Sequence, residues 1–159
     1  MEKIILLESD SINKTISRLS HEIIEKNPAG KFSIIGIRNR GDVIARKIKS
    51  KIEQTINKTI EFGTIDVTFH RDDYKQHLPS PKIGTTEILF EIEGKTLILV
   101  DDVLFTGRTI RSAMDEVFSF GRPSSIQLVV LVDRGHREIP IKASFVGKNY
   151  PTSKNEHIH

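Results

Sequence analysis

The chain of 159 residues has the length of one compact domain, contains no cysteine and carries a net charge of +3. These values exclude disulfides, thiolate nucleophiles and cysteine-bound metal clusters, and they are compatible with phosphate or nucleic-acid partners without selecting them. The apolar run at residues 4–7 ends at Glu8, and no run is long enough to span a bilayer. We therefore expect a single cytoplasmic domain over residues 1–159, with no membrane association.

The first half of the chain predicts two helices alternating with two strands. A helix begins at Ser9 and stops at residues 27–30, and its apolar stripe is Ile12, Ile16, Leu19 and Ile23. Residues 32–37 predict a short strand, followed by a turn at residues 38–41. Asp42 opens a second helix, whose apolar side is Val43, Ile44, Ile48 and Ile52. Residues 60–69 alternate well enough for a second strand.

The second half predicts a strand, a helix and a strand after a long loop. Residues 70–86 hold Pro79, Pro81 and Gly84 and predict the most mobile loop. Residues 96–100 form a continuous apolar run, which is typical of a strand buried on both faces. A helix follows, with the stripe Ile110, Ala113, Met114, Val117 and Phe118, and then a strand at residues 126–132. This order predicts the α/β class: an open, mostly parallel twisted sheet flanked by helices.

Residues 97–109 carry the strongest chemical signal. A buried strand runs into Asp101 and Asp102, and a turn at residues 106–109 then opens a helix. Gly107 at a helix N-terminus suits a phosphate, because unpaired backbone N–H groups and the helix dipole point at it. The hydroxyls of Thr106 and Thr109 and the charge of Arg108 add to this. Carboxylates beside a phosphate favour sugar hydroxyls, Mg²⁺ or both as partners. The alternative is that these residues only cap the strand and the helix.

The same segment resembles the phosphoribosyl pyrophosphate (PRPP) motif of type I phosphoribosyltransferases. Residues 36–41, 69–73, 121–127, 132–141 and 146–153 narrow the resemblance to the bacterial pyrimidine-operon attenuators, which carry uracil phosphoribosyltransferase activity. The resemblance covers nearly the whole chain. It implies a phosphoribosyltransferase sheet with a small hood beside it. Asn39 stands where that family usually has Thr, and family members usually continue for about 20 further residues, roughly one strand and a tail.

The resemblance implies transfer of a phosphoribosyl group from PRPP to uracil, giving uridine monophosphate (UMP) and pyrophosphate, with Mg²⁺ bound to PRPP. Such a transfer passes through a cationic ribose, so catalysis consists mainly of holding the leaving group and needs no strong protein nucleophile. By resemblance, the expected catalytic residues are Arg71, Asp101 and Asp102, the two aspartates holding the ribose hydroxyls and approaching the metal. The expected 5′-phosphate and pyrophosphate contacts are Thr106, Gly107, Arg108 and Thr109, and Arg38, Arg40 and Gly41, respectively.

The expected base pocket is the hood, formed by Val132, Asp133, Arg134 and Arg137 with residues 147–149. Which atoms read the uracil edges does not follow from the sequence. For Arg38 and Arg40 the alternative is a solvated basic turn, and for Arg71 it is a surface ion-pair cluster.

The pyrimidine-operon family also binds messenger RNA, with the uridine nucleotide as a co-ligand. Lys14, Arg18 and His21 are spaced i, i+4, i+7 on one stripe of the first predicted helix. By resemblance, the RNA surface comprises these three residues with His136, Arg137, Lys142 and Lys148. The alternative for the helix stripe is an ordinary solvated face. The resemblance also implies a homo-oligomer, a dimer or larger.

Three functional hypotheses therefore stand side by side. The first is a uracil phosphoribosyltransferase that also regulates, and the intact Asp101–Thr109 unit favours it. The second is an RNA-binding attenuator and nucleotide sensor with weak or no catalysis, since sensing needs the same phosphate site. The third is a phosphoribosyltransferase for a purine base; residues 132–140 favour uracil over it by resemblance.

Overall fold

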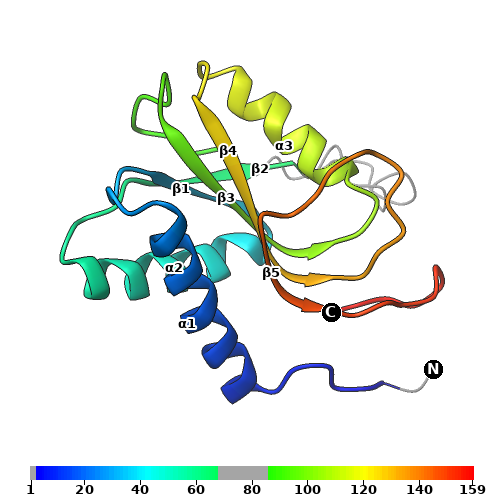
Figure 1. The fold of residues 1–159 in the computed structure, drawn as a ribbon. Helices are drawn as coiled ribbons and strands as arrows, with labels where there is room; N and C mark the ends of the chain where they lie inside the picture. The colour runs from blue at the N-terminus through cyan, green and yellow to red at the C-terminus, as the bar shows by residue number, and fades with distance from the viewer. Residues whose placement is uncertain (1–2, 68–85) are drawn as a thin grey trace.

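A five-stranded sheet forms the centre of the computed structural model, which describes residues 3–67 and 86–159 (Figure 1). All four strand pairs are parallel. The strands are β1 (Ser33–Arg38), β2 (Phe62–Asp66), β3 (Thr96–Leu104), β4 (Ser125–Asp133) and β5 (Phe145–Asn149), in the spatial order β2-β1-β3-β4-β5. The helices are α1 (Ser9–Lys26), α2 (Gly41–Ile56) and α3 (Arg108–Phe118). The predicted α/β class and open parallel sheet are confirmed.

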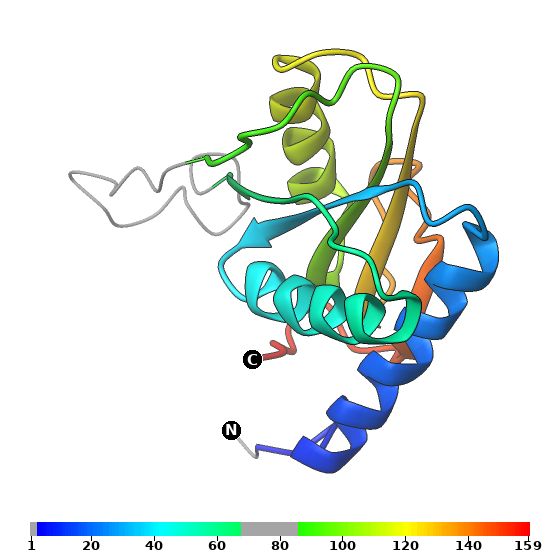
Figure 2. The same cartoon turned by 90° about the vertical axis from the view of Figure 1, so that its left-hand side faces the viewer.

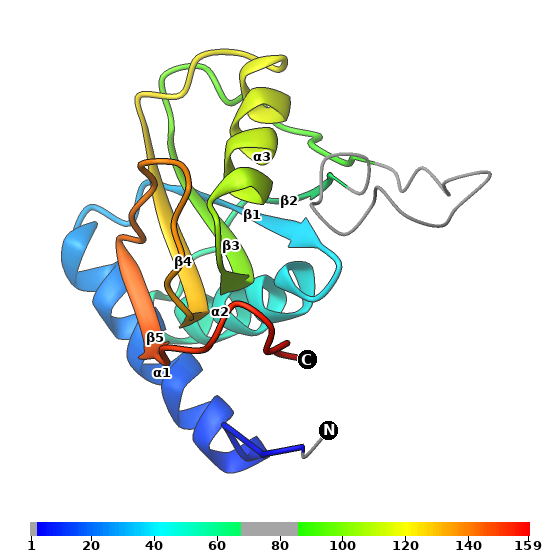
Figure 3. The same cartoon turned by 90° about the vertical axis from the view of Figure 1, so that its right-hand side faces the viewer.

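Two hydrophobic cores lie on the two faces of the sheet. Figures 2 and 3 show α3 on one side of the sheet and α1 with α2 on the other. Leu97 and Leu99 pack in the core beneath α3, whereas Ile98 and Val100 pack in the core beneath α1 and α2. Side chains alternate between faces along a strand. The unbroken apolar run at residues 96–100 is therefore explained by a strand covered on both sides, as predicted.

The three predicted helices are present, but the prediction that Val43 and Phe118 belong to their buried apolar stripes is wrong. Val43 is 51% exposed and Phe118 is 54% exposed. Each stands one residue from a buried stripe position, Ile44 and Val117 respectively. One residue is a rotation of roughly 100° around a helix, which turns these two side chains away from the sheet.

The strands differ from the sequence prediction in their ends. β3 runs to Leu104 and includes both carboxylates, whereas the prediction ended the strand at Val100. β2 is shorter than the predicted strand at residues 60–69, and the predicted loop at residues 70–86 lies outside the described residues apart from Thr86. β5 was not predicted as a strand. Its residues 147–149, expected in the hood, instead pair in parallel with the end of β4.

No helix within residues 3–67 and 86–159 is long and apolar enough to cross a membrane.

Glu53 joins α2 to the chain that leads into β2. Its Oε2 accepts the backbone N–H of Ile60 at 2.8 Å, and its Oε1 lies 2.9 Å from the ammonium of Lys49. These two bonds lower the pKa of Glu53 below its ordinary value of 4.5. A carboxyl whose pKa is lower in the folded state stabilises the fold above its unfolded pKa. That contribution is lost as the pH falls through the folded pKa.

We expect Glu53→Gln to lower the free energy of unfolding by about 1 kcal/mol at pH 7, because the amide keeps an acceptor for Ile60 but loses the charge. The difference from the wild type shrinks as the pH falls below about 4, where the carboxyl itself becomes neutral. Urea denaturation at pH 7 and pH 3 measures both values. Glu25→Gln, on the exposed face of α1, is the matched control. A difference that stays constant with pH contradicts the proposed role of the charge.

Candidate active site

A cleft of about 590 Å³ lies at the carboxyl ends of the strands. From β1 the chain moves to β2 on one side, and from β3 it moves to β4 and β5 on the other. In open α/β sheets ligands bind at such a reversal of strand order, because the loops diverge there and leave a crevice. The cleft is lined by Asn39, Arg40, residues 101–107, Thr109, Ile110, Arg134, Lys154, His157, Ile158 and His159.

The loop after β1 is held by two close backbone approaches. A Cβ at Gly36 would lie 2.5 Å from the Cα of Asp42, and a Cβ at Gly41 would lie 2.7 Å from the carbonyl oxygen of Val100. α2 therefore begins directly against β1 and β3, and the loop before it projects Arg40 into the cleft. Arg40 has φ 79°, an uncommon conformation for a residue with a side chain, and the Arg38–Asn39 peptide is cis.

The two carboxylates at the end of β3 are oriented by local hydrogen bonds. Asp101 is 2% exposed, and its Oδ1 accepts the backbone N–H of Asp102 at 2.9 Å. Oδ1 of Asp102 accepts the N–H of Val103 at 2.8 Å. The other oxygen of Asp102 lies 3.9 Å from a guanidinium nitrogen of Arg40. The cleft therefore sets a cation and a carboxylate opposite each other, one from the β1 loop and one from β3.

The loop between β3 and α3 has the form of an anion site. Gly107, with φ 95°, directly precedes α3, and the N–H of Arg108 donates to Oγ1 of Thr106 at 3.2 Å. The carbonyl of Thr106 accepts the N–H groups of Glu138 and Ile139 at 2.9 and 3.1 Å. The first N–H groups of a helix have no intrahelical partner, and the helix dipole is positive there. The loop is thus rigidly held with anion-binding groups facing the cleft.

Several predicted phosphate-binding residues lie elsewhere. Arg108 is not among the residues that line the cleft, and its Nε donates to Glu138 at 3.0 Å. Gly41 is also absent from the cleft lining, and it packs against the backbone of Val100 and Asp101. Arg38 is not in the cleft lining, and its buried Nε has no hydrogen-bond partner among the described residues. The predicted catalytic residue Arg71 lies outside the described residues.

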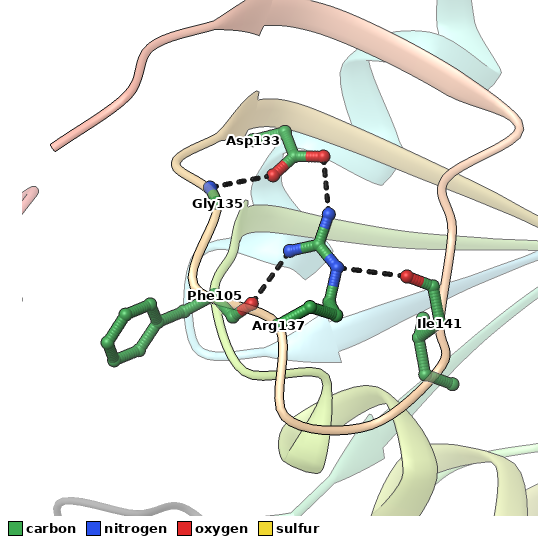
Figure 4. A network of polar contacts seen from close by, with 5 residues as sticks. All are labelled: Phe105, Asp133, Gly135, Arg137 and Ile141. Carbon is green, nitrogen blue, oxygen red and sulfur yellow. Dashed lines mark hydrogen bonds and ion pairs between the residues drawn. The ribbon is translucent and has the colours of Figure 1, made fainter.

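We define the hood as residues 134–144, between β4 and β5. Arg137 holds the hood in place through bonds within the protein and does not extend toward a ligand (Figure 4). All three guanidinium nitrogens of Arg137 are engaged: with Asp133 at 2.6 Å, the Phe105 carbonyl at 2.7 Å and the Ile141 carbonyl at 2.9 Å. Val132 is buried in the sheet. Of the four residues predicted to bind the base, only Arg134 lines the cleft. The inward position of Arg137 also does not fit the direct RNA contact expected of it.

Arg134 ties the hood to the chain after β5. It is 5% exposed, its guanidinium lies 4.0 Å from the centre of the Phe105 ring, and its Nε donates to Oγ1 of Thr152 at 2.8 Å. Burial lowers the pKa of Arg134 below its ordinary value, although a guanidinium keeps its charge in proteins. His136 adds a ring-nitrogen hydrogen bond to the Thr152 carbonyl.

The sequence did not predict that the C-terminal segment, residues 150–159, contributes to the site. Figure 3 shows it running from β5 toward the end of β3, and Lys154, His157, Ile158 and His159 line the cleft. Arg134, which contacts both Phe105 and Thr152, joins it to the loop after β3, far away in the sequence. No periodicity or short motif encodes such a contact, so local patterns carried no signal for it.

The residues predicted to bind RNA lie on α1, on β5 and in the hood. Arg18 on α1 donates to the carbonyls of Val146 and Gly147 on β5 and pairs with Glu22 at 2.9 Å. A Cβ at Gly147 would lie 2.8 Å from Thr15, so the two elements touch. Lys14 and His21 are exposed on α1, and Lys148 is exposed on β5. Because side chains alternate along a strand and Gly147 faces α1, Lys148 points to the other side of the sheet. Lys142 is exposed on the hood, whereas His136 and Arg137 turn inward.

Comparison with known families defines the class of protein. The phosphoribosyl transferase domain model matches residues 5–159. Among solved structures, hypoxanthine phosphoribosyltransferase of Trypanosoma cruzi superposes with a TM-score of 0.73, at 21% identity over 94% of this chain and 82% of that one. The Staphylococcus aureus enzyme gives 0.70, at 24% identity over 94% and 78%. At these identities the likeness shows the shared fold. It does not show that this chain acts on the purine base named for those enzymes.

Relatives with higher identity narrow the family. A protein of Elusimicrobium minutum named "Bifunctional protein PyrR" is 50% identical over 100% of this chain and 89% of its own length. One of Clostridioides difficile with the same name is 48% identical over 99% and 90%. The chain belongs to the PyrR family of phosphoribosyltransferase-domain proteins. The resemblance noted in the sequence is confirmed.

Proposed function

We propose that the protein transfers the phosphoribosyl group of PRPP to uracil and releases pyrophosphate, within one phosphoribosyltransferase domain. The observation that carries the proposal is the cleft itself, in which the α3 loop, Asp101–Asp102 and Arg40 meet. An anion site, a pair of carboxylates and a second cation match the 5′-phosphate, the ribose and the pyrophosphate of a single ligand. Family membership supports the same activity.

Each group has a distinct task in this proposal. The α3 N-terminal loop with Thr106 and Thr109 holds the 5′-phosphate, which anchors the ribose. Asp101 and Asp102 face the ribose ring, where they orient its hydroxyls and stabilise the positive charge that develops as the bond to pyrophosphate breaks. Arg40 binds the departing pyrophosphate.

The residues of the cleft fit a magnesium ion that arrives with its substrate. Among residues 3–67 and 86–159, no group of three or more metal-ligating side chains gathers at one point. Mg²⁺ typically uses one or two carboxylates and completes its shell with water and substrate phosphates. Asp101 and Asp102 supply such carboxylates and would hold the ion against PRPP. When bound, the ion neutralises charge on the pyrophosphate.

A pyrophosphate-release assay with PRPP tests the proposal. We expect release with uracil in Mg²⁺, loss of release in EDTA, and none with hypoxanthine or guanine. Release with a purine instead would support the proposed phosphate site but contradict uracil as the substrate base. Binding of UMP without release for any base would identify a nucleotide sensor.

We also propose that the protein binds pyrimidine-operon leader RNA in a UMP-dependent manner, as a homo-oligomer. The exposed basic side chains of Lys14 and His21 on α1 and of Lys148 on β5 favour this second function. The relatives named above are called bifunctional. Arg18 joins α1 to β5 through its bonds to the Val146 and Gly147 carbonyls, and Lys142 is exposed on the hood.

We expect Lys14→Glu with Lys148→Glu to weaken leader-RNA binding at least tenfold in filter binding with UMP. The reason is that each substitution removes one lysine–phosphate contact. Each lost contact also releases about one counterion fewer, so the salt dependence of binding becomes less steep. UMP affinity of the free protein stays unchanged, since neither side chain lines the cleft. The control, Lys47→Glu with Lys51→Glu on α2, changes the charge equally. If both double variants lose RNA binding equally, the effect comes from the change in net charge, and the proposed RNA contacts of Lys14 and Lys148 are wrong.

A further inference from the structure

The C-terminal segment reaches the cleft as a fixed element. The N–H of Tyr150 donates to the Asp133 carbonyl at 2.8 Å, and Arg134 bonds to Thr152 and to the Ser153 carbonyl at 2.8 and 2.9 Å. Beyond Lys154, Glu156 closes a turn: its carboxylate accepts the N–H of Ser153 at 2.7 Å. The backbone is therefore fixed on both sides of Lys154.

Arg134 couples this segment to the phosphate loop. Its buried guanidinium lies against Phe105, the residue that precedes Thr106, while its nitrogens hold Thr152 and Ser153. Buried charged groups are costly unless they are bonded, and here the bonds all serve to join two walls of the cleft. Arg134 thus acts as an anchor, because its guanidinium group is engaged by Thr152, Ser153 and Phe105 within the protein.

The charges in the cleft single out Lys154. The cationic side chains that line it are Arg40, Arg134 and Lys154, and the anionic ones are Asp101 and Asp102. Arg134 is engaged as described, and Arg40 lies 3.9 Å from Asp102. Lys154 is exposed, and no ion pair joins it to a carboxylate of the described residues. A lysine that lines the cleft and has no ion pair with these carboxylates is available to a ligand.

We infer that Lys154 is a ligand-binding residue of this cleft, whose ammonium group donates to an oxygen acceptor of the bound nucleotide. The inference rests on the proposed function, because that function supplies the ligand. UMP offers two such acceptors, its phosphate oxygens and its uracil carbonyls. Both attract a cation, and the phosphate does so with a full charge.

Lys154→Gln tests the inference, with Lys47→Gln on the exposed face of α2 as the matched control. We expect calorimetric titration to show UMP binding about tenfold weaker in Lys154→Gln than in the control. Ribose 5-phosphate and uridine separate the two acceptors. Weakening with UMP and ribose 5-phosphate, but not uridine, assigns Lys154 to the phosphate. Weakening with UMP and uridine, but not ribose 5-phosphate, assigns it to the base. Both results support the inference.

Equal UMP affinity in the two variants overturns the role of Lys154 while leaving the proposed function intact. A wild-type protein that neither binds UMP nor releases pyrophosphate overturns the proposed function, and the role of Lys154 falls with it. Because Lys154 is exposed, we expect the variant to unfold at the control's temperature, and thermal unfolding verifies that affinity is compared between folded proteins.

Discussion

Replacing Asp102 with asparagine lowers turnover with PRPP and uracil at least tenfold, which corresponds to about 1.4 kcal/mol of barrier. The exchange keeps the size of the side chain and one acceptor oxygen, but it replaces the other oxygen with an NH2 donor and removes the charge. That charge is expected to matter most when the ribose becomes cationic, so the loss falls on turnover more than on PRPP affinity. Steady-state kinetics at saturating uracil measures both.

Asp115→Asn is the matched control for this experiment. Asp115 lies on the exposed side of α3, where its carboxylate is 3.7 Å from Arg111. The control removes the same charge from the same protein without touching the cleft, and we expect unchanged kinetics. If Asp102→Asn also retains full turnover, the carboxylate has no part in the chemical step and the proposed mechanism is wrong.

Gly41→Ala is expected to damage both the fold and the activity. The new Cβ would stand 2.7 Å from the Val100 carbonyl oxygen and 2.9 Å from the Asp101 Cα. Both neighbours are backbone atoms of β3, so either α2 or the strand must move. Overpacking of this kind costs about 1–3 kcal/mol of stability. Because Asp101 follows the displaced atoms directly, we also expect turnover to fall at least tenfold.

The control for this variant is Gly94→Ala. Gly94 has φ 70°, and a Cβ there would meet nothing within 4 Å. The control therefore destabilises the fold by roughly 1 kcal/mol through positive-φ strain, which Gly41 does not have, and it does so without any collision and outside the cleft lining. Urea denaturation and turnover together separate the two effects. Full activity in Gly41→Ala would show that the contact between α2 and β3 does not position Asp101.

The sequence predicted most of the fold because its main signals are local. The stripe Ile16, Leu19 and Ile23 repeats within one helix, and the run at residues 96–100 lies within one strand. β5 had no comparable signal. Residues 145–149 are short and include Gly147, Lys148 and Asn149, and only pairing with β4 makes them a strand. The exposure of Val43 and Phe118 likewise depends on where the sheet lies relative to each helix.

The site was predicted in part for the same reason. Asp101, Asp102, Thr106, Gly107 and Thr109 belong to one contiguous segment, and all of them line the cleft. Arg137 was expected to face a ligand because the family resemblance places it in the hood and on the RNA surface. The structure turns it toward Asp133 and two carbonyls, none of which its position in the chain specifies.

The sequence by itself determined the order of helices and strands, the phosphate loop and its paired carboxylates, and the family. These depend on residue spacing within short stretches, where the backbone restricts which side chains meet. The tertiary structure alone decided that Arg40 faces Asp102, that Arg134 joins the phosphate loop to the C-terminal segment, and that Lys154 enters the cleft. Those contacts join residues far apart in the chain. They arise from the strand order, the two close glycine packings and the buried guanidinium, which only the assembled sheet brings together.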